Sequence, residues 1–358
     1  MRERACGRKG YDDFMTGIWT AIAAILIFCI LIFVHELGHF LAAKLLGIRV
    51  HEFAIGMGPK LFGRKKGDTL YSVRALPIGG FCALEGENES SGDPKALSNK
   101  PAWVKFIVLA AGSFMNLLLG LLLLFCLYGT AKGIVVPQVA MVESGGAAEL
   151  AGVKAGDEIL SLGARRIHIA GDLSWQKTRL TGEQTELVVK RDGEKQSILL
   201  VPQETQNGLN LGIRLAQKEN SLGLTLKTGF YSTIFYARIV LETFIDLLRG
   251  NVGFQNMSGP IGIVSEIGSA VQQTAESGLA GLLNLVQLTV LLTINLGVFN
   301  LLPIPALDGG RIFFVLVEII RRKPLPPEKE GLVHTIGFAL LILLSLVIAY
   351  MDVLKLMV

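Results

Sequence analysis

The chain has 358 residues and a formal net charge of +4, with 51% hydrophobic residues and only 18% charged residues. This composition is too apolar and too poor in charge for an ordinary soluble protein of this length. The small positive charge suits a membrane protein and gives no reason to expect nucleic acid as a partner. Because the four cysteines lack the spacing of a zinc or redox motif, no structural disulfide is expected.

Four long runs without a charged residue predict four transmembrane helices. The runs cover residues 17–34, 106–128, 279–305 and 335–351. Each is near or above the ~20 residues that a helix needs to cross a bilayer, and the last is the shortest. A cleaved signal peptide is the alternative for the first run because basic residues precede it, but no small-residue cleavage site follows. Met15 is an alternative start, which would remove that basic leader.

The distribution of basic residues predicts the orientation of these helices. Residues 44–105 hold ten Lys and Arg, and residues 306–333 hold five more. Short positive loops stay in the cytoplasm, so both connections are expected there. Residues 129–278 and both chain ends are then expected outside, although the basic leader argues against this unless Met15 is the start.

The first run ends in LIFVHELGHF (31–40), which places two histidines and a glutamate at membrane depth. His35 and His39 are four residues apart, so they share one face of a helix, and Glu36 lies next to that face. Such a pair can bind zinc, with the glutamate taking a proton from the attacking water. Gly38 leaves room for a neighbouring backbone. Histidines that are only buried and hydrogen-bonded inside a bundle are the alternative, but such groups are costly in lipid without a partner.

The long segment between the second and third runs contains a small soluble module. VESGGAAELAGVKAGDEILSLGARRI (142–167) combines a helix start of small residues, a tight Gly-Asp turn and a strand. Short strands are expected at 186–191, 197–202 and 209–215, separated by the turns DGEK and TQNG. Residues 134–216 resemble a PDZ domain of the type found in bacterial membrane and envelope proteases. That resemblance implies binding of a peptide C-terminus or steric gating; a β domain that merely shields the membrane part is the alternative.

An apolar stripe follows the module in residues 232–250. Its members recur at helical spacing, so the segment is expected to lie at the membrane surface or to pack on the bundle. They are Ile234, Leu241, Phe244, Ile245 and Leu248.

A catalytic zinc site needs a third protein ligand and an open fourth position. The candidates are His51, His168, His334 or a carboxylate. His168 belongs to the outer module and so lies on the wrong side of the membrane. The strongest candidate is Asp308 in NLLPIPALDGGR (300–311), because the first and third helices both run inward and bring it to the depth of the histidines. A loop aspartate that caps a helix is the alternative.

The segment around Asp308 has an irregular backbone. Pro303 and Pro305 cannot continue a helix, and Gly309 and Gly310 allow close backbone approach. Irregular backbone at membrane depth is tolerated only where it lines a cavity or is covered by protein. The segment is therefore expected to line a buried site.

HELGH in the first run, NxxPxPxLDGG in the third and a PDZ-like module between the second and third resemble the site-2 protease family, in particular its bacterial RseP type. The resemblance covers nearly the whole chain. It implies that His35, His39 and Asp308 bind one Zn²⁺ and that Glu36 is the general base. The single module departs from Gram-negative members, which carry two.

Other stretches resemble the same family locally. Residues 53–62 and 71–81, with Gly79 and Gly80, look like its membrane-embedded β-hairpin, whose edge could pair with an unwound substrate segment. AAGSFMNLLLG (110–120) matches its second helix, and NMSGPIGIV (256–264) matches a Gly-Pro segment before its third. Two asparagines of the third helix match residues thought to position the substrate or the site, with hydrogen bonds between packed helices as the alternative. They are Asn295 and Asn300.

The expected fold is a polytopic α-helical membrane protein with about four transmembrane helices, a membrane-associated β-hairpin and one extracytoplasmic PDZ-like α/β domain. The expected parts follow in chain order. They are a leader with the first transmembrane helix (1–45), a cytoplasmic-side loop with the hairpin (46–104), the second helix (105–130), the PDZ-like domain (134–216), an amphipathic linker (217–278), the third segment with LDGG (279–310), and a cytoplasmic loop with the fourth helix (311–358).

The resemblance implies an intramembrane zinc endopeptidase of the bacterial inner membrane. Its expected partners are the lipid bilayer and transmembrane protein substrates, such as anti-sigma factors or signal-peptide remnants. The alternative is a membrane-bound PDZ scaffold or chaperone with a non-catalytic metal site. The intact His35, Glu36, His39 and Asp308 favour the enzyme. A metal transporter would need more polar residues along several helices.

Overall fold

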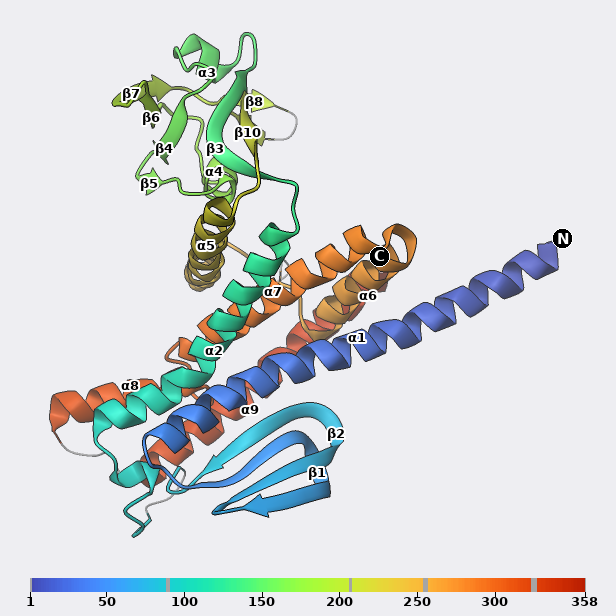
Figure 1. The fold of residues 1–358 in the computed structure, drawn as a ribbon, viewed down its shortest axis with the longest axis vertical. Helices are drawn as coiled ribbons and strands as arrows, with labels where there is room; N and C mark the ends of the chain where they lie inside the picture. Colours follow the sequence, from blue (N-terminus) through green and yellow to red (C-terminus); the bar gives the residue numbers. More distant parts are fainter. Residues whose placement is uncertain (1, 88–90, 206–207, 254–256, 323–326, 358) are drawn as a thin grey trace. The chain divides into compact units, whose positions relative to one another are not determined.

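The computed structural model describes residues 2–87, 91–205, 208–253, 257–322 and 327–357. The chain forms two compact units, one made of Met1–Leu123 with Ala237–Val358 and the other of Leu124–Tyr236 (Figure 1). Asn256, in the predicted Gly-Pro segment, and two residues of the predicted TQNG turn lie outside the described residues.

The first unit is mainly helical, and its described part contains four helices that are long and apolar enough to cross a membrane. These stretches are Met15–Leu45, Ala102–Gly129, Leu279–Leu301 and Glu330–Lys355, and they contain the four predicted runs almost entirely. The protein is therefore a polytopic membrane protein. The helices of this unit are α1 (Arg2–Leu45), α2 (Ala102–Gly129), α6 (Pro260–Ser277), α7 (Leu279–Leu301), α8 (Asp308–Arg321) and α9 (Pro327–Met357).

Helices α1, α6 and α7 pack against one another around a small apolar core (Figure 1). Ala24, Ile27 and Leu31 of α1 meet Ile267 of α6 in this core. Large apolar side chains elsewhere on the helices are exposed, as in α9, where Leu346 is 63% exposed. Exposed apolar surface of this extent is unfavourable in water but fits contact with lipid.

Two long bent strands follow α1, namely β1 (Val50–Lys66) and β2 (Thr69–Leu84). They pair antiparallel twice, because Phe53 lies opposite both Tyr71 and Cys82. The register therefore gives four strand segments in the order 80–84, 50–55, 69–74 and 60–66, with 80–84 at one edge. Both predicted strands of the hairpin are present, but the double pairing was not expected.

An apolar core fixes this sheet to the helices beside it. The core combines the end of α1, both strands and the start of α2, which brings the edge segment 80–84 next to α1. Its buried members are Ala43, Ile48, Val50, Phe53, Cys82, Leu84, Leu97, Val104 and Val108.

The third apolar segment is broken near Pro303 and Pro305, as the sequence predicted. Helix α7 ends at Leu301 and α8 begins at Asp308. Pro303 and Pro305 explain the break, because each removes a backbone donor and clashes with a preceding helical turn. Residues 311–321, at the start of the predicted cytoplasmic connection, belong to α8.

The second unit contains an antiparallel sheet with the strand order β10-β3-β4-β6-β7, to which β5 adds beside β4. Its core is apolar and includes Val139, Ile159 and Leu187, each nearly inaccessible. The predicted strand 209–215 is interrupted, because Gly212 has a φ of +70° and separates β9 from β10. The elements are β3 (Gly133–Val142), α3 (Ala147–Leu150), β4 (Glu158–Leu162), β5 (Arg165–Arg166), α4 (Ala170–Lys177), β6 (Thr185–Arg191), β7 (Glu194–Leu200), β8 (Gln203–Thr205), β9 (Gly208–Asn210) and β10 (Ile213–Glu219).

Helix α5 (Leu222–Leu248) follows β10 and contains the predicted apolar stripe. The exposed members of that stripe are Ile234, Leu241, Ile245 and Leu248.

Candidate metal centre

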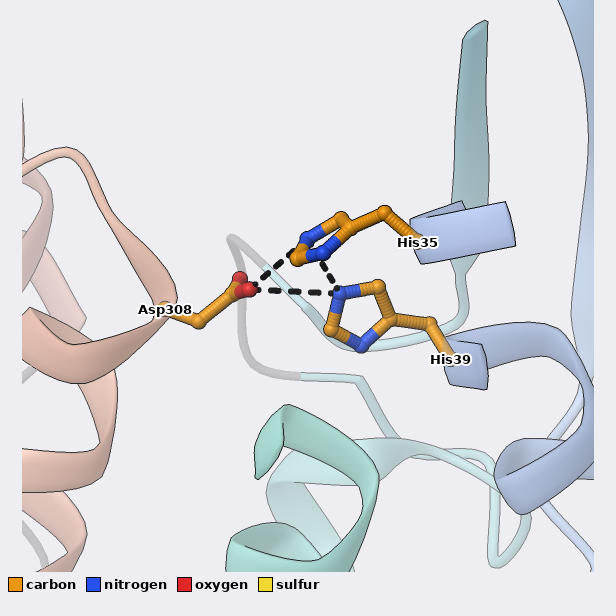
Figure 2. Close-up of side chains that lie close together, drawn as sticks. All are labelled: His35, His39 and Asp308. Carbon is orange, nitrogen blue, oxygen red and sulfur yellow. Dashed lines mark hydrogen bonds and ion pairs between the residues drawn. The ribbon is translucent and has the colours of Figure 1, made fainter. Parts of the chain in front are cut away.

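His35, His39 and Asp308 meet at one point, although the aspartate lies far from the histidines in the sequence (Figure 2). The two Nε2 atoms of the histidines are 3.2 Å apart. Asp308 Oδ2 lies 3.0 Å from the Nε2 of His35 and 3.3 Å from the Nε2 of His39. Both histidines are buried, and the aspartate side chain is 21% exposed. Within the described residues this is the one group of three such side chains that can hold a metal ion.

The spacing of these three atoms fits a small tetrahedral ion. Zinc binds nitrogen and oxygen ligands at about 2.0–2.1 Å, so neighbouring ligands of a tetrahedral site lie about 3.3 Å apart. The observed separations of 3.0, 3.2 and 3.3 Å are close to that value. Two imidazoles and one carboxylate are also a usual ligand set for catalytic zinc.

The orientation of His39 supports this arrangement. Its Nδ1 lies 2.8 Å from the backbone oxygen of Val108 in α2. A carbonyl oxygen can only accept, so Nδ1 carries the proton and the Nε2 lone pair faces Asp308 and His35. A lone pair turned toward a carboxylate is repelled unless a metal ion or a second ring proton lies between them.

Two glycines after Asp308 allow the start of α8 to pack closely against the end of α7, which places Asp308 near the histidines. An added Cβ on Gly309 would overlap the backbone oxygen of Leu302, and one on Gly310 would lie 2.6 Å from that of Ile304. The turn between α7 and α8 is therefore so tight that only glycine fits at positions 309 and 310. Asp308 is the first residue of α8, so its position follows directly from that turn.

Helix α8 is held by two ion pairs at its ends. Near its start, the guanidinium of Arg311 lies 2.6 Å from Glu87, in the segment that follows β2. Near its end, Glu318 lies 3.0 Å from Lys105 of α2. Both pairs are partly buried, and they fix the helix that begins with Asp308 to the neighbouring elements.

The other three histidines do not join the metal centre. His334 of α9 accepts a hydrogen bond from the backbone N–H of Ala306 at 2.9 Å. His51 contacts Glu85 at 2.5 Å, and His168, in the second unit, stacks on Tyr231. Of the candidates for a third ligand, Asp308 alone reaches both Nε2 atoms.

Glu36 lies beside the edge of the four-segment sheet. An added Cβ on Gly80 would be 3.9 Å from the Cγ of Glu36 and 2.8 Å from the backbone oxygen of Ala54. Gly79 is also buried and has a φ of +85°, which other residues rarely adopt. Both predicted glycines therefore lie where a sheet edge passes close to the glutamate.

The two predicted asparagines of α7 differ in their contacts. The Nδ2 of Asn300 lies 3.5 Å from the Nε2 of His35. The Oδ1 of Asn295 is buried and has no hydrogen-bond partner among the described residues. The structure therefore brings Asn300 to the metal centre, whereas the described residues show no contact between Asn295 and that centre.

Helix α2 contributes to the metal centre through Gly112, for which the sequence predicted only a family resemblance of residues 110–120. An added Cβ on Gly112 would overlap the Nε2 of His39 and lie 2.9 Å from that of His35. The backbone of α2 therefore passes directly beside the two histidines. Gly38 of α1 contributes to this close crossing, because its Cβ would overlap the backbone of Ala111. The signals in the sequence were the match of residues 110–120 to the second helix of the family and the presence of Gly38 and Gly112 in apolar helices.

Comparison with known proteins is in accord with this centre. The sequence profile of peptidase family M50 matches residues 23–344. The chain is 38% identical over 335 residues to a Clostridium acetobutylicum protein whose name describes it as a zinc metalloprotease. The match covers 93% of this chain and 96% of that protein. It is 31% identical over 418 positions to the zinc metalloprotease RasP of Geobacillus kaustophilus, covering 93% and 97%. It is 30% identical over 424 positions to the regulator of sigma-W protease RasP of Bacillus subtilis, covering 94% and 99%.

Proposed function

The chain belongs to peptidase family M50 and is a zinc metalloprotease, and on this premise we propose that it cuts membrane proteins within or beside their transmembrane segments. The position of the metal centre carries this proposal. His35 and His39 are buried residues of Met15–Leu45, a helix long and apolar enough to cross a membrane. Hydrolysis at that depth can reach only a peptide bond that enters the bilayer.

In this proposal His35, His39 and Asp308 bind one zinc ion and Glu36 is the general base. Zinc supplies a Lewis acid that polarises the scissile carbonyl and makes water acidic enough to lose a proton near neutral pH. Glu36 accepts that proton as the water oxygen bonds to the scissile carbonyl carbon, and it then passes the proton to the leaving nitrogen. The C–N bond then breaks, and a carboxylate and an amine are released.

The groups around Glu36 are suited to hold an extended substrate. A transmembrane helix hides its amides, so a segment must unwind before water can attack it. An unwound segment can add as a strand to the edge formed by residues 80–84, where Gly79 and Gly80 leave space. The Asn300 amide, 3.5 Å from His35 Nε2, can donate a hydrogen bond to a substrate carbonyl. We assign Asn295 to the same region, with helix packing as its alternative role.

We infer that the second unit is a PDZ-like domain that controls access. Strand β10 lies at one end of the strand order, so its outer edge pairs with no other strand of the described residues, and we assign the peptide C-terminus to that edge. The domain can also exclude substrates with bulky outer domains. The basic loops 44–105 and 306–333 favour a cytoplasmic position for the centre and an extracytoplasmic one for the domain. The resemblance to bacterial RseP-type proteases favours the inner membrane and substrates such as anti-sigma factors or signal-peptide remnants.

The test compares wild-type protein with Glu36→Gln, which keeps the shape of the side chain but cannot accept the proton. Each purified protein is mixed with a bacterial single-pass membrane protein trimmed of its outer domain, and mass spectrometry locates the cut. We expect wild-type protein to cut within or beside the transmembrane segment. Glu36→Gln should bind one zinc ion, capture the substrate and lose at least ~10²-fold in rate.

His39→Ala is the matched control, because it removes a ligand rather than the base. It should lose both zinc and cleavage. Zinc loss from Glu36→Gln would show that Glu36 is a ligand or a structural support. Cuts confined to soluble loops of the substrate would contradict cleavage within the membrane.

A further inference from the structure

One face of α2 contacts both histidines of the metal centre. Val108, Gly112 and Asn116 recur every four residues, so they form one stripe along the helix. The Val108 oxygen accepts from His39 Nδ1, and Gly112 provides the space beside both rings. The Nδ2 atom of the Asn116 amide lies 3.3 Å from His35 Nδ1.

The two histidines are oriented by different kinds of group. His39 contacts a backbone carbonyl, which has no donor and therefore permits one tautomer only. His35 contacts a side-chain amide, which offers an NH₂ donor on one side and an oxygen acceptor on the other. The tautomer of His35 therefore depends on which end of the Asn116 amide faces it.

Asn116 is well placed for this role. It is fully buried, and its Oδ1 has no hydrogen-bond partner within the described parts of the chain. The backbone oxygen of Asn116 accepts a hydrogen bond from the Thr293 hydroxyl of α7 at 3.1 Å. A Cβ added to Gly297 of α7 would lie 3.3 Å from the Cβ of Asn116. The residue is thus fixed between α1 and α7, and rotation of the amide is its main remaining freedom.

We propose that Asn116 is the positioning residue for His35: its Oδ1 accepts a hydrogen bond from His35 Nδ1–H and keeps the Nε2 lone pair directed at zinc. When no metal is present, the same amide can donate to Nδ1 while Nε2–H faces Asp308 at 3.0 Å. With zinc bound, both histidines present Nε2 to the metal, His39 oriented by the Val108 backbone carbonyl and His35 oriented by Asn116. The inference rests on the proposed zinc site.

The test measures zinc affinity of the purified full-length protein by competition with a chromophoric chelator. Partners that orient metal-bound histidines typically change metal affinity or activity by 10- to 100-fold, so Asn116→Ala should bind zinc about that much more weakly. Asn116→Asp keeps an acceptor oxygen and should stay near wild type. The matched control is Ser113→Ala, which removes another fully buried polar group of α2 whose hydroxyl has no hydrogen-bond partner among the described residues.

Wild-type zinc affinity in Asn116→Ala would overturn the proposal. So would an equal loss in Asn116→Ala, Asn116→Asp and Ser113→Ala, which would indicate packing alone. If wild-type protein binds no zinc, the proposed function fails with the inference; if wild type and Asn116→Ala bind equally, the inference alone fails.

A second measurement needs no substitution at position 116, so it holds even if Asn116→Ala does not fold. In zinc-loaded wild-type protein, a neutral His35 that binds metal through Nε2 carries its proton on Nδ1. Nuclear magnetic resonance of protein labelled with ¹⁵N-histidine and ¹³C-asparagine should show a hydrogen bond from this Nδ1–H to the side-chain carbonyl of Asn116. A His35 Nδ1–H without that hydrogen bond would overturn the proposal.

Discussion

The backbone N–H of Ala306 donates a hydrogen bond to Nδ1 of His334 at 2.9 Å and so fastens the turn before Asp308 to α9. Ala306 has a φ of +77°, a conformation that is unfavourable for a residue with a side chain. The adjacent Pro305 packs directly on Gly337, where a Cβ would overlap the proline. Helix α9 therefore supports the strained turn that carries the third metal ligand.

Replacing His334 by Ala should loosen that turn without removing a ligand. This hydrogen bond is partly buried, and leaving a buried backbone donor without a partner costs about 1–3 kcal/mol. We expect about 10-fold weaker zinc binding and a similar loss of cleavage rate. His334→Asn, which retains an acceptor, should recover most of both. His51→Ala, which changes an exposed histidine paired with Glu85, is the control and should behave as wild type. Complete zinc loss in both His334 variants would mean that this residue is a ligand.

Gly112→Ala should damage the metal centre directly, because its methyl group would overlap His39 Nε2. The neighbouring atoms belong to the two histidine rings, so α2 must move away or the rings must turn. We expect loss of most bound zinc, measured by metal analysis, while the protein remains inserted in membranes. Gly129→Ala is the matched control on the same helix, since nothing lies within 4 Å of its added Cβ. Full zinc content in Gly112→Ala would contradict the close approach of α2.

The ligands of the metal centre could be predicted from the sequence because all three are side chains of recognisable motifs. HELGH fixes two histidines on one helix face, and the LDGG motif marks Asp308 after a segment that prolines must break. The four long uncharged runs predict the membrane helices for the same reason, since length and polarity suffice.

The groups that orient these ligands, and the turns and strands that position them, could not be predicted from the sequence in the same way. The Val108 carbonyl is a backbone atom with no sequence signature, and Gly112 lies in an apolar helix where glycine is common. The double pairing of β1 with β2 depends on where each strand bends, which the alternation of side chains does not specify. The start of α8 at Asp308 likewise depends on how tightly Gly309 and Gly310 pack against the end of α7.

The second unit should lose stability in acid through Asp157. This carboxylate accepts two hydrogen bonds from Arg191, each 2.7 Å long, and its side chain is 1% exposed. The bonds from Arg191 hold the pKa of Asp157 below its usual range. Because the folded-state pKa is the lower one, the stabilisation is complete above the unfolded pKa of about 4 and disappears as the pH falls through the folded value.

Thermal unfolding of the excised module, residues 133–219, between pH 2 and 7 checks this expectation. Asp157→Asn should be less stable by about 2 kcal/mol at pH 7 and should lose part of the acid dependence. Glu186→Gln changes a more exposed carboxylate that contacts Ser197, so it should stay within about 0.5 kcal/mol of wild type. An unchanged acid dependence in Asp157→Asn would show that other carboxylates control it.

Removing the module should separate substrate access from chemistry. Gly133 and Glu219 are paired residues of β3 and β10, and the backbone N–H of Asn220 bonds to the oxygen of Lys132. The two ends of the module are therefore adjacent, so a short Gly/Ser linker can replace residues 133–219 without stretching the chain. None of the metal-centre residues lies in the deleted segment.

If the module acts as a filter, the deletion variant should still bind one zinc ion and cut a substrate that lacks its outer domain. It should also begin to cut the same substrate with that domain intact, which the full-length enzyme should cut slowly or not at all. The measurement compares both substrates against both enzyme forms in cells, with Glu36→Gln in each form as the inactive control. A deletion variant that is inserted, binds zinc and yet cuts neither substrate would show that the module helps to assemble the active enzyme instead of selecting what enters it.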